Sequence, residues 1–136
     1  MIYELKITDK PGGLQVKERY KTLAGETFET AVLISTALAA TLVTTKIYSL
    51  LSDEPLTPME KNLNYGIPYI PTIPNPQRGL IKGFMLGGKL YGDIPVIVCD
   101  CEIGYSNNMI YGSNIILKKC RRFSVDRKMG KVIIET

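Results

Sequence analysis

The amino-acid sequence predicts a small, mostly β domain with one or two short helices. Two apolar runs, residues 31–34 and 94–99, have the aliphatic and β-branched composition of buried strands. Shorter strand-like segments lie between turns that contain Gly, Pro or Asp, a pattern typical of antiparallel sheets. With 136 residues, the chain is most simply a single domain, residues 1–136, large enough for a core of its own.

The first third of the chain predicts two or three antiparallel strands. Residues 1–7 alternate between apolar and polar side chains, and residues 14–22 place apolar side chains among charged ones. A Pro-Gly-Gly turn separates these two segments, and residues 24–26 form a plausible hairpin connection. That connection leads into a third strand over residues 28–34.

The longest apolar stretch, residues 31–43, begins as a strand and then turns through Ser35, Thr36 and Ala37. A turn of small residues at the end of a strand can present a side chain and backbone amides at the edge of a sheet. The stretch is predicted to continue into a short helix, because apolar residues recur at helical spacing as far as Leu51. Prolines beyond that point end the pattern.

Residues 59–79 are the least regular part of the sequence. They contain four of the eight prolines, together with the aromatic residues Tyr65 and Tyr69. Such a segment is typical of an extended loop, a linker or a flap that covers a ligand. A linker between two domains is the least favoured of these, because neither side is long enough for a comfortable core.

The second half of the chain predicts further strands and one more helix. Two glycines at 87–88 predict a turn, and Gly92 with Asp93 predicts another. An apolar-apolar-Gly motif follows later. The expected elements are, in order, strands over residues 79–86, 89–91 and 94–99, the motif Ile110-Tyr111-Gly112, a short helix over 113–120, and a terminal hairpin of 122–126 and 131–135.

Composition excludes several classes of site. The chain has no histidine, so it cannot form a Ser-His-Asp triad, a Cys-His pair or a zinc site with a histidine ligand. The formal charge of +4 is modest, and the densest basic group, residues 118–122, is more typical of a solvated face than of a nucleic-acid site. No metal and no cofactor are expected.

The remaining features predict a cytoplasmic protein that binds neither membranes nor nucleic acid. Cys99, Cys101 and Cys120 are expected to be reduced, partly buried thiols, because two cysteines separated by one residue are a weak metal signal. No charged-then-apolar leader opens the chain. The apolar stretch 31–43 is too short and too rich in threonine for a convincing membrane span.

Two motifs carry a resemblance to a known family. An apolar strand that runs into Ser35-Thr36-Ala37, followed later by Ile110-Tyr111-Gly112, resembles the retropepsin-like aspartic proteases. In that family the strand runs into Asp-Thr-Gly, and an apolar-apolar-Gly motif passes beneath the loop. The resemblance implies a small closed β-barrel, a homodimer with its two loops face to face, and a flap-like role for residues 59–79. It places Ser35, Thr36 and Ala37 at the catalytic positions, and the substrate-binding residues that it suggests are Tyr65, Tyr69, Ile110, Tyr111 and Gly112.

Ser35 stands where the family carries its catalytic Asp. Aspartic proteases need two carboxylates that share a proton, and a hydroxyl has no carboxylate state near neutral pH. Ala37 and Leu38 also depart from the family's pattern, and three neighbouring departures favour a naturally divergent loop over a single inactivating substitution. The simplest interpretation of Ser35 and Thr36 is that their hydroxyls satisfy turn amides.

The sequence therefore predicts a catalytically degenerate retropepsin-like homodimer that binds an extended peptide or a protein partner, or that serves in assembly. Two alternatives stay open. The chain could be an enzyme, either an aspartic endopeptidase inactivated by an Asp-to-Ser replacement at position 35 or an unusual Ser-dependent hydrolase. It could also be a structural β protein of a larger assembly.

Overall fold

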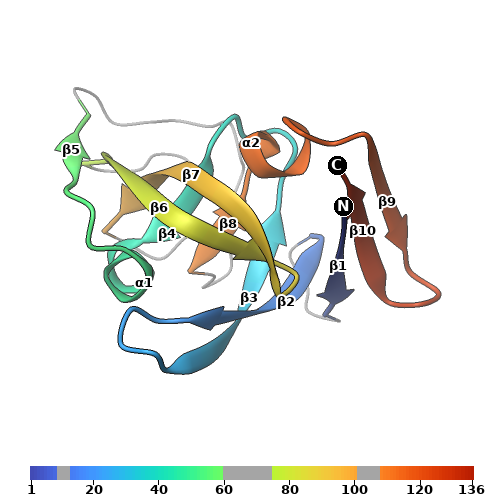
Figure 1. The fold of residues 1–136 in the computed structure, drawn as a ribbon. Helices are drawn as coiled ribbons and strands as arrows, with labels where there is room; N and C mark the ends of the chain where they lie inside the picture. The colour runs from blue at the N-terminus through green and yellow to red at the C-terminus, as the bar shows by residue number, and fades with distance from the viewer. Residues whose placement is uncertain (9–12, 60–74, 101–107) are drawn as a thin grey trace.

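A computed structural model describes residues 1–8, 13–59, 75–100 and 108–136 (Figure 1). Within these residues, ten strands form one sheet in the order β5-β6-β7-β4-β8-β3-β2-β1-β10-β9, accompanied by two short helices. The elements are β1 (Ile2–Ile7), β2 (Gln15–Lys21), β3 (Thr27–Ile34), β4 (Thr41–Thr44), α1 (Thr45–Leu51), β5 (Thr57–Pro58), β6 (Gln77–Leu86), β7 (Lys89–Cys99), β8 (Met109–Tyr111), α2 (Ser113–Ile116), β9 (Arg122–Asp126) and β10 (Lys131–Glu135).

The prediction of a mostly β chain with one or two short helices is confirmed, whereas the prediction of a closed barrel is wrong. The sheet curls around its core, but its edge strands β5 and β9 do not pair with each other. The terminal strands extend the sheet instead of closing it, because β1 pairs with both β2 and β10, and β9 adds beyond β10. Figure 1 shows β1, β10 and β9 standing together at one side, with the two chain ends adjacent.

Two antiparallel pairs, β2 with β3 and β9 with β10, form where local turn chemistry predicts them. β2 and β3 pair along their whole length, from Gln15 opposite Leu33 to Lys21 opposite Thr27. The terminal hairpin of β9 and β10 is equally regular. Asp126 stabilises its turn, because the carboxylate accepts a hydrogen bond of 3.0 Å from the Met129 N–H.

The predicted helix after the small-residue turn begins later than expected. Residues 41–44 form strand β4, which pairs with β7 on one side and β8 on the other and buries all four side chains. Three of these residues are β-branched, and two flanking strands favour an extended backbone for such residues. Helix α1 starts only at Thr45, and the Thr44 hydroxyl caps it by accepting a hydrogen bond of 3.4 Å from the Ile47 N–H.

The turn predicted at residues 92–93 does not form, because β7 runs without a break from Lys89 to Cys99. The register with its partner β6 shifts between Phe84 and Met85, and β6 also carries a bulge between Ile81 and Phe84. Gly83 takes up this bulge with a φ of +63°, and its N–H donates a hydrogen bond of 2.9 Å to the Asp93 carboxylate. Asp93 therefore stabilises a bulge across the hairpin and not a turn of its own.

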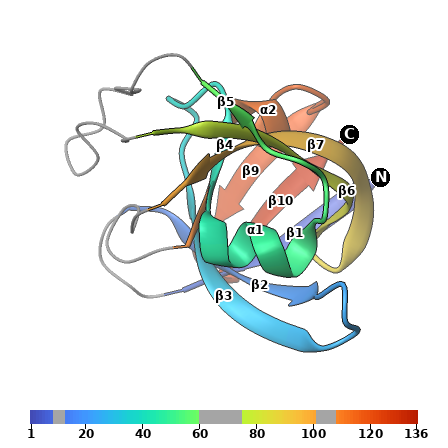
Figure 2. The same cartoon turned by 90° about the vertical axis from the view of Figure 1, so that its left-hand side faces the viewer.

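The core lies inside the curl of the sheet, and Figure 2 shows α1 across one open side of that curl. The largest fully buried side chains include Tyr111, Phe84 and Leu5. A smaller buried group lies near the loop that follows β3, and it consists of Leu33, Leu38, Leu42, Ile97, Cys99 and Ile110. That loop therefore rests on a packed apolar base.

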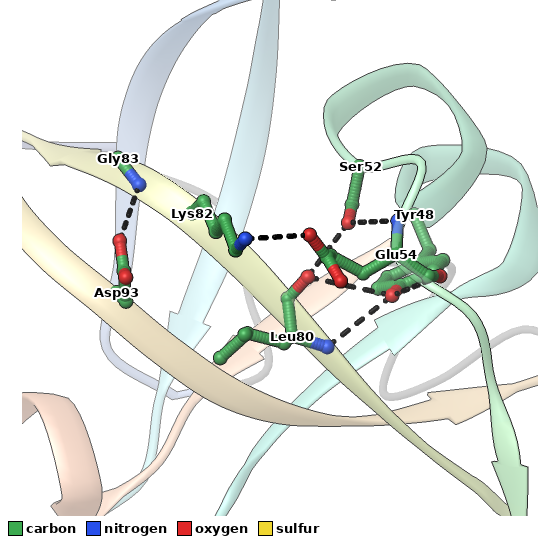
Figure 3. A network of polar contacts seen from close by, with 7 residues as sticks. All are labelled: Tyr48, Ser52, Glu54, Leu80, Lys82, Gly83 and Asp93. Carbon is green, nitrogen blue, oxygen red and sulfur yellow. Dashed lines mark hydrogen bonds and ion pairs between the residues drawn. The ribbon is translucent and has the colours of Figure 1, made fainter.

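A polar network attaches the end of α1 to β6 (Figure 3). The Tyr48 hydroxyl accepts a hydrogen bond of 3.2 Å from the Leu80 N–H and donates one of 2.9 Å to the Glu54 carbonyl. The Ser52 hydroxyl donates to the Leu80 carbonyl at 2.6 Å. Lys82 closes the network with an ion pair of 2.9 Å to the Glu54 carboxylate. These contacts hold β6 at the end where it meets β5.

Candidate functional site

The loop of residues 35–40 crosses strand β8. β8 lies between β3 and β4, parallel to the first and antiparallel to the second, so the loop that joins β3 to β4 must pass over it. Two backbone hydrogen bonds hold the crossing. The Ser35 N–H donates to the Tyr111 carbonyl at 3.0 Å, and the Ser113 N–H donates to the Leu38 carbonyl at 2.7 Å. The apolar-apolar-Gly motif thus passes beneath the small-residue loop, as the resemblance implies.

Gly112 permits the close approach of the two backbones. Its φ of −92° suits any residue, so the requirement for glycine is one of space. A Cβ at this position would collide with the Ala40 carbonyl oxygen and lie 2.6 Å from the Ala40 carbonyl carbon. The Gly112 N–H donates a hydrogen bond of 3.1 Å to Oγ1 of Thr41, and the Thr41 hydroxyl donates one of 2.8 Å to Oδ1 of Asn114. The buried Thr41 therefore joins the loop to the segment that crosses under it.

The three residues at the catalytic positions lie on the outer side of this crossing. Ser35 is half-buried, and Thr36 and Ala37 are exposed. Neither hydroxyl makes a hydrogen bond within the described residues, so the interpretation that they satisfy turn amides is not confirmed. Asn75 is the one described non-glycine residue with a positive φ, so Ala37 has an ordinary backbone conformation and the loop accommodates its methyl group.

The residues suggested to bind substrate lie in two different places. Ile110 and Tyr111 are fully buried beneath the loop and Gly112 is buried beside them, so direct contact of the two side chains with a peptide would require the core to open. Tyr65 and Tyr69 fall outside the described residues. That these five residues bind a substrate stays a prediction. In the structure, Ile110, Tyr111 and Gly112 support the loop from beneath.

A groove of about 210 Å³ opens between the loop and the base of the hairpin formed by β5 and β6. Its lining is mostly apolar and consists of Ala39, Ala40, Arg78, Gly79, Pro95, Val96, Ile97 and Asn114. β5 pairs with the start of β6, and the Met59 N–H donates to the Pro76 carbonyl at 3.0 Å. The described ends of the proline-rich segment 59–79 therefore form the base of a hairpin beside the loop.

Sequence reasoning missed a buried carboxylate, that of Glu18. Only 3% of Glu18 is exposed, because it lies on the inward face of β2 between Val16 and Tyr20. One carboxylate oxygen accepts a hydrogen bond of 2.6 Å from the Tyr111 hydroxyl, and the other accepts one of 3.1 Å from the Gly87 N–H. The Tyr111 hydroxyl also hydrogen-bonds to the Tyr20 hydroxyl. The strand's period of two, with apolar residues at 16 and 20, was a usable signal.

Burial governs the protonation of this group. It raises the pKa of Glu18 to about 7, against the hydrogen bonds from Tyr111 and Gly87, which lower it. Burial also raises the pKa values of Tyr20 and Tyr111 well above the ordinary value, so both hydroxyls stay neutral. Because both carboxylate oxygens are bound to Tyr111 and Gly87, Glu18 supports β8 from inside and supplies no carboxylate to the loop.

The sequence also makes predictions about the cysteines, a membrane span and a metal site. Cys99 is buried and Cys120 half-buried, while Cys101 falls outside the described residues. No helix in the described part of the chain is long and apolar enough to span a membrane. Across the same residues, no three Cys, Asp or Glu side chains gather closely enough to hold a metal ion.

Comparison with solved structures finds a similar fold. The crystal structure of a retropepsin-like aspartic protease from Rickettsia conorii matches with a TM-score of 0.55 and 13% sequence identity, over 98% of this chain and 91% of that one. No protein-family model and no curated protein sequence matches the chain. At this level of identity, the likeness concerns the fold alone. The chain therefore has a fold similar to that of a retropepsin-like aspartic protease.

Proposed function

We propose that this protein is a catalytically degenerate retropepsin-like module that acts as a homodimer and binds an extended peptide without cleaving it. The observation that carries the proposal is the loop of residues 35–40, which keeps its crossing over β8 while carrying a hydroxyl in place of a carboxylate. Aspartic proteolysis needs two carboxylates that share a proton, and Ser35 supplies none.

Binding a peptide without cleaving it does not require the catalytic carboxylates. The hydroxyls of Ser35 and Thr36 make no hydrogen bond within the described residues, so both can donate to and accept from a peptide backbone. The nearby groove combines an apolar lining with the exposed polar side chain of Arg78, whereas the amide of Asn114, which also lines it, is bonded to Thr41 and to the Pro95 carbonyl. Such a mixture suits an extended chain, because apolar contacts supply affinity and a few polar groups orient the ligand.

A substitution that fills the groove tests this proposal. Ala39 is exposed and lines the groove, so Ala39→Trp should weaken binding of fluorescein-labelled casein peptides about tenfold or more, measured by fluorescence anisotropy. Ala24→Trp is the matched control, because Ala24 is an exposed alanine in the turn between β2 and β3. No saturable binding to the wild-type protein, or equal binding by the two variants, would contradict peptide binding at this groove.

The second candidate function is an aspartic endopeptidase inactivated at position 35. The ordinary backbone conformation of Ala37 favours it, because the loop that would hold an Asp is retained. We expect neither the wild-type protein nor Ser35→Asp/Ala37→Gly to cleave casein at pH 4 to 7, since Leu38 also departs from the family's pattern. Ser35→Asn/Ala37→Gly is the uncharged control. Cleavage that only the Asp variant performs, and that increases toward acid pH, would establish the endopeptidase instead.

A further inference from the structure

The two edges of the described sheet differ in how well they are protected. β5 has two residues, and one of them is Pro58, which has no N–H to donate to a further strand. β9 has five residues, contains neither proline nor glycine, and pairs with β10 without a register shift. Among the described strands, β10 is the one neighbour of β9. The outer backbone groups of β9 are therefore available to another strand.

The sequence of β9 is complementary to itself when reversed. It reads Arg-Phe-Ser-Val-Asp from residue 122 to residue 126. In an antiparallel pair centred on Ser124, Arg122 lies opposite Asp126 of the second copy, and Phe123 lies opposite Val125. Opposite charges and apolar pairs both stabilise directly facing positions. A parallel pair in the same register would instead bring Arg122 opposite Arg122 and Asp126 opposite Asp126.

The inner face of β9 is incompletely covered within one chain. Phe123 and Val125 are the cross-strand partners of Ile134 and Val132, both of which are fully buried. Nevertheless, 38% of Val125 is exposed, and Phe123 is only half-buried. A second copy of β9 would place its Phe123 beside this Val125, so the apolar face would continue across the junction.

We propose that β9 pairs antiparallel with β9 of a second copy of this chain, about a twofold axis at Ser124, and joins the two sheets into one. The pairing rests on the homodimer of the proposed function and gives it an interface, but it does not require a bound peptide. Its twofold axis lies at the edge of the sheet and not between the two loops of residues 35–40, so it replaces the loop-to-loop arrangement that the resemblance implies. The partner strand is taken to be β9 of a second copy because Arg122 and Asp126, at the two ends of β9, carry opposite charges. The antiparallel direction follows from the same charges, since a parallel pair would repel at both ends.

Sedimentation velocity across a concentration series of the full chain tests the pairing. The wild-type chain should form a dimer. Arg122→Asp places Asp opposite Asp126 at both ends of the pair, and Asp126→Arg places Arg opposite Arg122, so each variant alone should raise the dissociation constant of the dimer about tenfold or more. An equimolar mixture of the two variants restores opposite charges at both ends. It should therefore form a heterodimer about as stable as the wild-type dimer.

Mixing separates pairing between chains from effects within one chain. Arg122 lies opposite Glu135 and Asp126 opposite Lys131 in β10, so either substitution also changes contacts within its own hairpin, and these do not change on mixing. Arg121→Asp is the charge-matched control, because Arg121 is exposed and lies just outside β9, and it should leave the dimer intact. A monomeric wild-type chain, single variants that dimerise normally, a mixture that stays monomeric, or species larger than a dimer would each overturn the pairing.

The outcomes for the interface and for the proposed function can be distinguished. Normal dimerisation of both single variants would move the dimer interface away from β9 and leave the proposed homodimer in place. Equal binding of casein peptides by Ala39→Trp and Ala24→Trp would instead reject the groove and leave the β9 pairing in place.

Discussion

Replacing Gly112 by alanine should destabilise this protein by about 3 kcal/mol or more. The added Cβ would collide with the Ala40 carbonyl oxygen and lie 3.0 Å from the Leu38 carbonyl oxygen. Both obstacles are backbone atoms of the loop above, so no side chain can rotate away to make room. That amount is a large part of the total stability of a typical domain, about 5 to 15 kcal/mol. Urea denaturation measures the loss, and far-UV circular dichroism shows whether the variant folds.

Gly25→Ala is the matched control for this prediction. Gly25 has a φ of +88°, and no atom lies within 4 Å of the site that a Cβ would occupy. The control therefore isolates the cost of a left-handed backbone without any collision, about 1 to 2 kcal/mol. Gly112, with its φ of −92°, isolates the collision without the backbone cost. If Gly112→Ala were no more destabilising than Gly25→Ala, the loop would not be held tightly against β8.

Glu18→Gln should abolish a loss of stability that the wild-type protein undergoes as the pH rises. Glutamine keeps the shape of the side chain and can still accept a hydrogen bond from the Gly87 N–H, but it carries no charge at any pH. At pH 5 the variant and the wild type should differ by about 1 kcal/mol or less, because Glu18 is then largely protonated. At pH 8 the variant should be the more stable of the two by up to about 3 kcal/mol.

The direction of this effect follows from the raised pKa. Between about pH 4.5 and 7 the folded chain keeps a proton on Glu18 that the unfolded chain releases. The stability contributed by the protonated group is fully present below the ordinary carboxyl pKa of 4.5 and is lost as the pH rises through about 7. The difference between these two pKa values corresponds to about 3 kcal/mol. Urea denaturation midpoints at pH 5, 6, 7 and 8 measure it.

Glu29→Gln is the control for the effect of pH. Glu29 lies on the neighbouring strand β3 with its carboxylate 3.0 Å from the Lys17 ammonium, and Lys17 lowers its pKa. Its stabilising effect is therefore lost only as the pH falls through a pKa below 4.5, so between pH 5 and 8 this variant should parallel the wild type. Parallel curves for Glu18→Gln and the wild type would mean that Glu18 is ionised in the folded protein.

Several features of this protein follow from the sequence alone, because short-range chemistry decides them. Alternating side chains and the turns between them act over a few residues, which is why the hairpin of β9 and β10 and the antiparallel pair of β2 and β3 form as predicted. The missing carboxylate at Ser35 is likewise a matter of residue identity. The absence of histidine excludes several catalytic sites whatever the fold.

The tertiary structure alone decided the features that depend on distant segments. Residues 41–44 become a strand because β7 and β8 flank them, although helical spacing extends into this segment. The sheet stays open because β1 accepts β10 as a partner, which leaves β9 at the edge. Glu18 acquires a pKa of about 7 because the folded chain buries it, and this effect of burial outweighs the hydrogen bonds from Tyr111 and Gly87 that lower the pKa. Strand pairing and burial depend on segments that meet only in the folded chain, and no local pattern encodes which segments these are.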